Sequence, residues 1–120
     1  MKVAIASTNG MVSGPGEAEE VHIYEINGSD IKLLDSYENP AKYKEYARGV
    51  YMLRSVMDKE VDAVVLSEIG GPGFRYVAGK IKVYIFEGSE NEALKKLMNN
   101  ELVEAKAPTH EHGHHHHLEI

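Results

Sequence analysis

The chain has 120 residues, which suffices for one domain and excludes two packed domains. Hydrophobic residues make up 42% of it and charged residues 27%, an ordinary balance for a globular protein. Its 19 acidic and 13 basic residues give a net charge of -6 without a Lys/Arg cluster, so nucleic acid is not an expected partner.

The sequence contains no cysteine, which excludes disulfides, thiolate nucleophiles and Cys-ligated zinc or iron-sulfur clusters. Its longest apolar runs fall far short of the roughly 20 residues that a membrane span needs, and its N-terminus leads directly into a strand-like pattern. We therefore expect a cytoplasmic protein without a membrane partner.

The N-terminal part predicts three strands. Residues 2–7 form an apolar run that ends in turn-forming residues, as expected of a strand covered on both faces. Residues 21–26 and 31–38 are two further β-prone runs separated by Asn27-Gly28, a strong hairpin signal. These three strands are predicted to form an antiparallel meander.

The middle of the chain predicts a long helix over residues 41–58. Its predicted buried stripe comprises Tyr43, Tyr46, Ala47, Val50, Tyr51, Arg54 and Met57. The tyrosines of this stripe could instead be read as a stacking platform, but their helical spacing favours a core face.

The C-terminal part alternates strands and helices. Strands are predicted at residues 61–67 and 81–86, with a helix from Pro72 to Ala78 between them, and this order implies a parallel pair with a right-handed crossover. Ser89 and Glu92 form a capping box before a helix over residues 90–99. Its predicted buried stripe is Ala93, Leu94, Leu97 and Met98.

The element order is therefore β-β-β-α-β-α-β-α, which predicts an α/β fold with a mixed five-stranded sheet and three helices. We assign residues 1–104 to this domain. From Ala105 onward Pro, Gly, His and charged residues dominate, so residues 105–120 are predicted to be a flexible, disordered tail.

Two glycine-containing loops predict a ligand site. Residues 8–20 and 67–73 both follow strand C-termini, and they would form the two lips of one crevice if those strands are neighbours. The second loop could present backbone N–H groups to an anion beside Arg75, or its glycines could only make a tight turn. The predicted cofactor-binding residues are Ser13, Gly14, Gly16, Gly70, Gly71, Gly73 and Arg75.

Six of the seven histidines cluster near the C-terminus, and imidazoles this dense chelate Ni or Zn. The predicted metal ligands are His110, His112, His114, His115, His116 and His117. The alternative is a purification tag, but such tags usually have six consecutive histidines. This run has four and is interrupted by Glu and Gly, which favours a native tail.

The remaining histidine, His22, has no Cys, His or Asp at ligand spacing, so we interpret it as structural. No Ser-His-Asp arrangement or Gly-x-Ser-x-Gly motif is present, and the acidic residues do not form a two-metal nuclease cluster. We predict no catalytic residues and no enzymatic activity.

Several segments carry a family resemblance: the opening KVAIAS, the Ser13-Gly14-x-Gly16 loop, the strand HIYEI at 22–26, DAVVLSEIG at 62–70 and the helix start at Ser89. Together they resemble the dinitrogenase iron-molybdenum cofactor-binding family over residues 1–103. The resemblance implies a ribonuclease H-like fold. It also implies a non-catalytic nitrogenase-accessory role in binding an iron-molybdenum or iron-sulfur type cluster, with a protein partner in cofactor assembly.

The chain departs from this family in one loop. Members usually carry a Ser-x-His-Phe-Gly-Arg-like stretch whose His is the proposed cofactor ligand. Here the stretch reads SGPGEA from Ser13, without the His, Phe or Arg, and Glu17 adds a negative charge. Two functions follow from these observations: a carrier of a metal or metallocluster, or an interaction or regulatory module that has lost cofactor binding.

Overall fold

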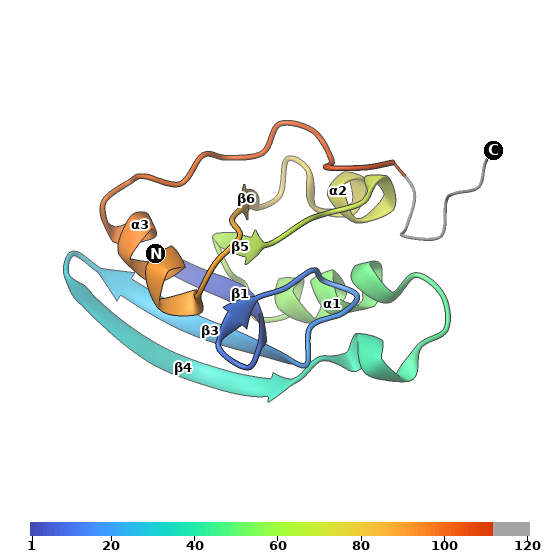
Figure 1. Cartoon of the computed structure of the whole chain (residues 1–120), viewed down its shortest axis with the longest axis horizontal. Coiled ribbons are helices and arrows are strands. Elements are labelled where there is room, and N and C mark those ends of the chain that lie inside the picture. The colour runs from blue at the N-terminus through green and yellow to red at the C-terminus, as the bar shows by residue number, and fades with distance from the viewer. Residues whose placement is uncertain (112–120) are drawn as a thin grey trace.

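The computed structural model of the chain describes residues 1–111, and within them six strands, three α-helices and one 3-10 helix are present (Figure 1). In chain order the elements are β1 (Lys2–Thr8), β2 (Met11–Val12), β3 (Glu20–Asn27), β4 (Asp30–Glu38), η1 (Pro40–Tyr43), α1 (Arg48–Met57), β5 (Ala63–Leu66), α2 (Gly71–Val77), β6 (Lys82–Ile85) and α3 (Glu90–Met98).

The strands form one mixed sheet in the order β4-β3-β1-β5-β6. β3 pairs antiparallel with both β1 and β4, whereas β5 pairs parallel with β1 and with β6. The predicted α/β fold with a mixed sheet and three helices is confirmed. The short strand β2, which the sequence analysis did not predict, folds back on β1 with Ser7 opposite Val12.

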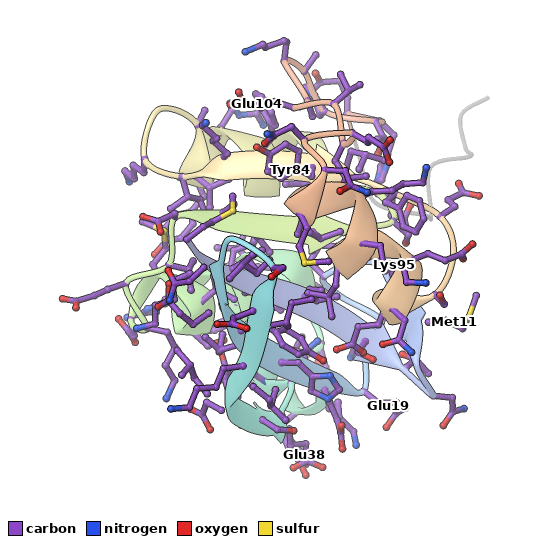
Figure 2. All side chains as sticks on the ribbon, turned by 90° about the vertical axis from the view of Figure 1, so that its left-hand side faces the viewer. Met11, Glu19, Glu38, Tyr84, Lys95 and Glu104 are labelled. Atoms are coloured by element: carbon purple, nitrogen blue, oxygen red, sulfur yellow. The ribbon has the colours of Figure 1, made fainter. Side chains whose placement is uncertain are left out.

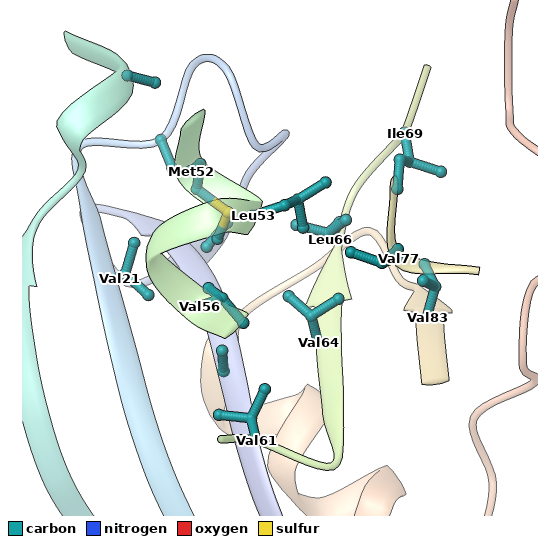
Figure 3. Close-up of a cluster of buried hydrophobic side chains, with 14 of the residues drawn as sticks. Val21, Met52, Leu53, Val56, Val61, Val64, Leu66, Ile69, Val77 and Val83 are labelled. Carbon is teal, nitrogen blue, oxygen red and sulfur yellow. The ribbon is translucent and has the colours of Figure 1, made fainter. Parts of the chain in front are cut away.

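Side-chain alternation along the central strand divides the core in two. Ala4 and Ala6 face α1 and α2, where they join a cluster that includes Leu53, Val56 and Val77 (Figure 3). Val3 and Ile5 point to the opposite face, which α3 covers. Because β1 and β5 are buried on both faces, their sequences read as continuous apolar runs rather than alternating ones.

The predicted helix over residues 41–58 is wrong in extent. Residues Pro40–Tyr43 form η1, and α1 begins only at Arg48 because Ala47, with φ of 55°, adopts the left-handed conformation that interrupts a helix. The predicted stripe is wrong as well, since Tyr43 and Tyr46 are 73% and 82% exposed. The buried face of α1 consists of Met52, Leu53 and Val56.

The capping box of α3 is confirmed: the Ser89 side chain accepts from the Glu92 N–H, and the Glu92 side chain accepts from the Ser89 N–H. Ala93, Leu94 and Leu97 are buried as predicted. The first residue of the helix, Glu90, is buried too, which the sequence analysis did not predict.

Residues 101–111 run along β6 toward α2 (Figure 1). The Ala105 N–H donates to the Val83 carbonyl at 2.7 Å, and the Thr109 N–H donates to the Ile69 carbonyl at 2.8 Å. The prediction that residues 105–111 have no packed structure is therefore wrong, because this segment contacts the domain. Its backbone groups pair with a sheet edge and a loop, and the local sequence pattern gives no sign of these partners. None of the helices in residues 1–111 has the length and apolar character to cross a membrane.

Candidate functional site

A cleft of about 520 Å³ lies on the sheet face that carries α1 and α2. Four segments line it: residues 15–17 of the loop after β2, residues 45–50 at the start of α1, the loop around Glu68 to Gly73, and His110. Its volume is typical of small-molecule sites. The structure thus brings together the two loops from which the sequence analysis predicted a crevice.

The two loops are joined through the backbone of Ser13. Its N–H donates to the Ala6 carbonyl at 2.8 Å, and its carbonyl accepts from the Ser67 N–H at 3.0 Å. Ala6 belongs to β1, and Ser67 directly follows β5. The loop is therefore fixed to the carboxyl ends of two adjacent parallel strands, the usual position of a ligand site in an α/β fold.

Asn39 holds the same loop from the opposite side. Its side chain is fully buried, and its Nδ2 donates to the carbonyls of Pro15 and Ala18 at 2.9 Å each. Its Oδ1 accepts from the Ala41 N–H at 3.0 Å and so caps η1. One side chain therefore connects the cleft wall to the segment that leads into α1.

The start of α1 forms the third wall, and glycines allow its close approach. A Cβ on Gly49 would lie 3.2 Å from Cγ of Pro15, and a Cβ on Gly16 would lie 3.3 Å from Cβ of Arg48. Arg48 Nε donates to the Gly16 carbonyl at 3.0 Å. Larger residues at either glycine would separate the loop from the helix.

The charged lining of the cleft consists of Glu17, Glu45, Glu68, Arg48 and His110. The carboxylates of Glu17 and Glu68 converge above Gly14, where an added Cβ would meet their oxygens at 2.5 and 2.8 Å. His110 Nδ1 lies 3.8 Å from Glu68 Oε1. Within residues 1–111, no three His, Asp or Glu side chains meet at metal-ligand spacing, so a metal held here would also need water or ligands of its own.

Only some of the predicted site residues line the cleft. Gly16, Gly70, Gly73 and His110 line the cleft. Ser13 instead donates its hydroxyl to Thr8 Oγ1 at 2.8 Å, and Gly14 lies beneath the two carboxylates. His112 and His114 to His117 lie outside the described residues.

Gly71 and Arg75, which led us to consider an anion-contacting loop, both contact Glu111. The Gly71 N–H donates to the Glu111 carbonyl at 3.2 Å, and Arg75 Nη1 donates to the Glu111 carboxylate at 3.2 Å. In this conformation the two donors that could contact an anion are therefore bonded to Glu111.

Sequence reasoning missed Asn39, Arg48 and Gly49. Asn39 lies just before the predicted helix over residues 41–58, where the local pattern gives no sign of its contacts with the loop. Gly49 falls inside a predicted helix, where glycine lowers helix stability by about 1 kcal/mol relative to alanine. A glycine retained at such a position can indicate that another segment approaches closely, and this is the signal that could have identified it.

A second polar cluster lies on the opposite face of the sheet, beside α3. The Glu90 carboxylate accepts from the Ser7 hydroxyl at 2.8 Å, from His22 Nδ1 at 2.6 Å and from the Tyr24 hydroxyl. His22 Nε2 also faces Glu20 Oε1 at 2.8 Å. Both ring nitrogens of His22 thus have a carboxylate partner, as expected of a structural residue, and Glu90 links β1 and β3 to α3.

The pKa values of this cluster follow from its contacts. Burial alone lowers the pKa of His22, but the hydrogen bonds and charges of Glu20 and Glu90 outweigh it and raise that pKa above 6.5. Burial alone raises the pKa of Glu90, but its hydrogen bonds from Tyr24, His22 and Ser7 outweigh it and leave the pKa below 4.5. The His22–Glu90 pair is therefore charged over a wider pH range than isolated side chains would be.

The fold and the cleft define a small α/β domain with a cavity at the carboxyl ends of adjacent parallel strands, and solved structures share this fold. A Methanocaldococcus jannaschii protein described as a dinitrogenase candidate superposes with a TM-score of 0.70 at 19% identity, covering 90% of this chain and 97% of its own. The apo orange protein of Desulfovibrio gigas gives a TM-score of 0.76 at 15% identity, with coverages of 89% and 94%. A NifB candidate from Thermotoga gives 0.66 at 28% identity, with coverages of 86% and 91%.

Residues 1–100 match the family model described as dinitrogenase iron-molybdenum cofactor, so the chain belongs to this family. The resemblance that the sequence motifs indicated is confirmed. No curated protein matches the chain significantly.

Proposed function

We propose that this chain is a non-catalytic carrier that binds a metal ion or a metallocluster precursor in its cleft. The family supports this proposal, because its description refers to a metal cofactor. The observation that carries it is the position of His110. This first residue of the His-rich segment lines the cleft beside Glu68, so imidazole and carboxylate donors face the same cavity.

The donor set favours a metal cation over an anionic cluster. Carboxylate oxygen and imidazole nitrogen suit Zn²⁺, Ni²⁺ or Co²⁺, whereas iron-sulfur clusters prefer thiolates, and this chain has no cysteine. Three glutamates around the cleft also repel an anion, and among the described lining residues only Arg48 and His110 can offset them. A cluster of net negative charge therefore fits this cavity less well than a cation.

Calorimetry and metal analysis test the proposal. Ni²⁺, Zn²⁺ and a molybdate-thiolate cluster mimic are titrated into the full chain and into residues 1–111, which retain His110 but not the other tail histidines. We expect residues 1–111 to bind one divalent cation. His110→Ala and Glu68→Gln should each weaken that binding by about tenfold or more.

Glu101→Gln is the matched control, because Glu101 is exposed and does not line the cleft. It should leave the affinity unchanged. If only the full chain binds metal, the tail alone is the metal site and the cleft proposal fails. That result would favour the second candidate function, an interaction or regulatory module. The contacts of Glu111 with Gly71 and Arg75 agree with this function.

A further inference from the structure

The two edges of the sheet differ in how they are covered. Beyond β6, Glu104 forms a bridge with Tyr84, and Figure 2 shows these two residues together at one end of the molecule. β4 forms the opposite edge, and within residues 1–111 no segment pairs with its outer side. β4 is also the longest strand described, with nine residues, and Figure 1 shows it as the outermost strand.

The uncovered strand carries exposed apolar side chains. Ile31, Leu33 and Leu34 are 38%, 52% and 43% exposed. Ile31 lies opposite Ile26 and Leu33 lies opposite Tyr24, so both extend the apolar sheet face that α3 covers over the neighbouring strands. An unpaired strand with exposed apolar side chains is a template for pairing with another strand.

A β-bulge decides which side chains of β4 share a face. The register shifts between Ile23 and Tyr24, whose partners are Asp35 and Leu33, so Leu34 is an extra residue. Residues three apart lie on opposite faces of a regular strand. Here Lys32 and Asp35 pair with Glu25 and Ile23, which are two apart, so both side chains lie on the same face.

This arrangement makes β4 complementary to itself. If a second copy pairs antiparallel about a two-fold axis between Leu33 and Leu34, Lys32 faces Asp35 of the partner subunit and Leu33 faces Leu34 of the partner subunit. Ile31 then faces Ser36 of the partner subunit, and these two also lie on one face because their β3 partners, Ile26 and His22, are four apart. Because of the two-fold symmetry each contact occurs twice, so this register contains two Lys32–Asp35 pairs of opposite charge.

We propose that β4 is the interface of a homodimer in which two copies of this chain join their sheets edge to edge in this register. The Lys32–Asp35 complementarity selects a second copy as the occupant of the edge. No residue of β4 lines the cleft, so both clefts of the dimer stay accessible. The proposal is independent of metal binding.

Sedimentation velocity of the full chain over a range of concentrations, with EDTA present to exclude bridging by metal, tests this interface. We expect a monomer-dimer equilibrium. Lys32→Asp and Asp35→Lys should each raise the dissociation constant by about a hundredfold or more, because each variant opposes two pairs of like charges. An equimolar mixture of the two variants should dimerise again, since every introduced charge then faces an opposite one.

Two controls separate the interface from effects on folding. Lys59→Ala removes the ion pair that Lys59 makes with Asp35 at 2.9 Å but leaves β4 unchanged, so it should dimerise like the wild type. Circular dichroism checks that all variants are folded. A wild-type chain that stays monomeric at every concentration overturns the interface, and a mixture that does not dimerise overturns the register.

Discussion

The two faces of the sheet place glutamate in opposite environments. Beside α3, the Glu90 carboxylate is buried and accepts hydrogen bonds from Ser7, His22 and Tyr24. Beside α1 and α2, Glu17 and Glu68 border a cavity of about 520 Å³. Glu90 is buried and bonded to side chains of two strands, so it stabilises the fold, whereas Glu17 and Glu68 line the cavity and contribute to its charge. The environment of each residue, rather than its type, distinguishes the two roles.

The largest expected effect is on the α3 face. Glu90→Ala removes the shared acceptor of three side chains from β1 and β3, so we expect the free energy of unfolding to fall by about 3 kcal/mol. Urea denaturation measures this loss. Glu87→Ala, at an exposed position three residues earlier, should change stability by less than about 0.5 kcal/mol. Equal losses in the two variants would show that the cluster does not stabilise the fold.

Next in size is the residue that holds the cleft wall. Asn39→Ala leaves the carbonyls of Pro15 and Ala18 without their side-chain donor and removes the cap of η1, for an expected loss of about 2 kcal/mol. Unlike Glu90→Ala, it should also speed hydrogen exchange in residues 13–18 and weaken cation binding in the cleft. Asn91→Ala, at an exposed position in α3, is the control and should do neither. Unchanged exchange in the loop would contradict the assigned role of Asn39.

A smaller effect is the pH dependence that the His22–Glu90 pair contributes. Because the pKa of His22 is raised in the folded state, its stabilisation is fully present below pH 6.5 and is lost as the pH rises through the folded value. Because the pKa of Glu90 is lowered, its stabilisation is present above pH 4.5 and is lost as the pH falls. The contribution of the pair should therefore be greatest between pH 4.5 and 6.5.

Urea denaturation from about pH 5 to about pH 9 measures this dependence. His22→Asn should flatten the decline on the alkaline side, because asparagine at this position does not titrate. A decline of the same slope in the variant would assign the effect to other groups.

The smallest expected effect on stability belongs to Gly14. A methyl group at this position would meet the carboxylate oxygens of Glu17 and Glu68 at 2.5 and 2.8 Å, and these are the ends of flexible side chains that can move away. Gly14→Ala should change the free energy of unfolding by less than about 1 kcal/mol. It should nevertheless weaken cation binding measurably in calorimetry, because the two carboxylates no longer converge. Unaltered binding would place the cation elsewhere in the cleft.

Much of the fold was predictable from local patterns. The hairpin at Asn27-Gly28, the apolar run of β5 and the capping box at Ser89 each carry their own structural signal, and all three are confirmed. The long helix was wrong because one left-handed residue, Ala47, interrupts it, and alanine gives no sequence signal for that conformation. Helical spacing also placed Tyr43 and Tyr46 in the core, whereas tertiary packing selected Met52, Leu53 and Val56 instead.

For the cleft, the sequence could indicate the two loops but not the residues that complete them. Glycines after strands predict a crevice because the carboxyl ends of parallel strands share one edge of a sheet. Asn39 holds the cleft wall and His110 lines the cleft, both from segments distant in sequence, and no short-range pattern encodes such contacts. The contact of Glu111 with Arg75 was hidden for the same reason, since the two residues are 36 positions apart.

The backbone of Ser13 couples the cleft to the cooperative unfolding of the domain. Its hydrogen bonds to Ala6 and Ser67 connect two strands that are far apart in sequence, and the parallel pairing of β1 with β5 is one of the slow, non-local steps of folding. The amide of Ser67 should thus exchange with solvent only when the loop at Ser13 separates from the end of β5. The cleft is complete only after both strands are in place, so a partly folded chain would have no ligand site.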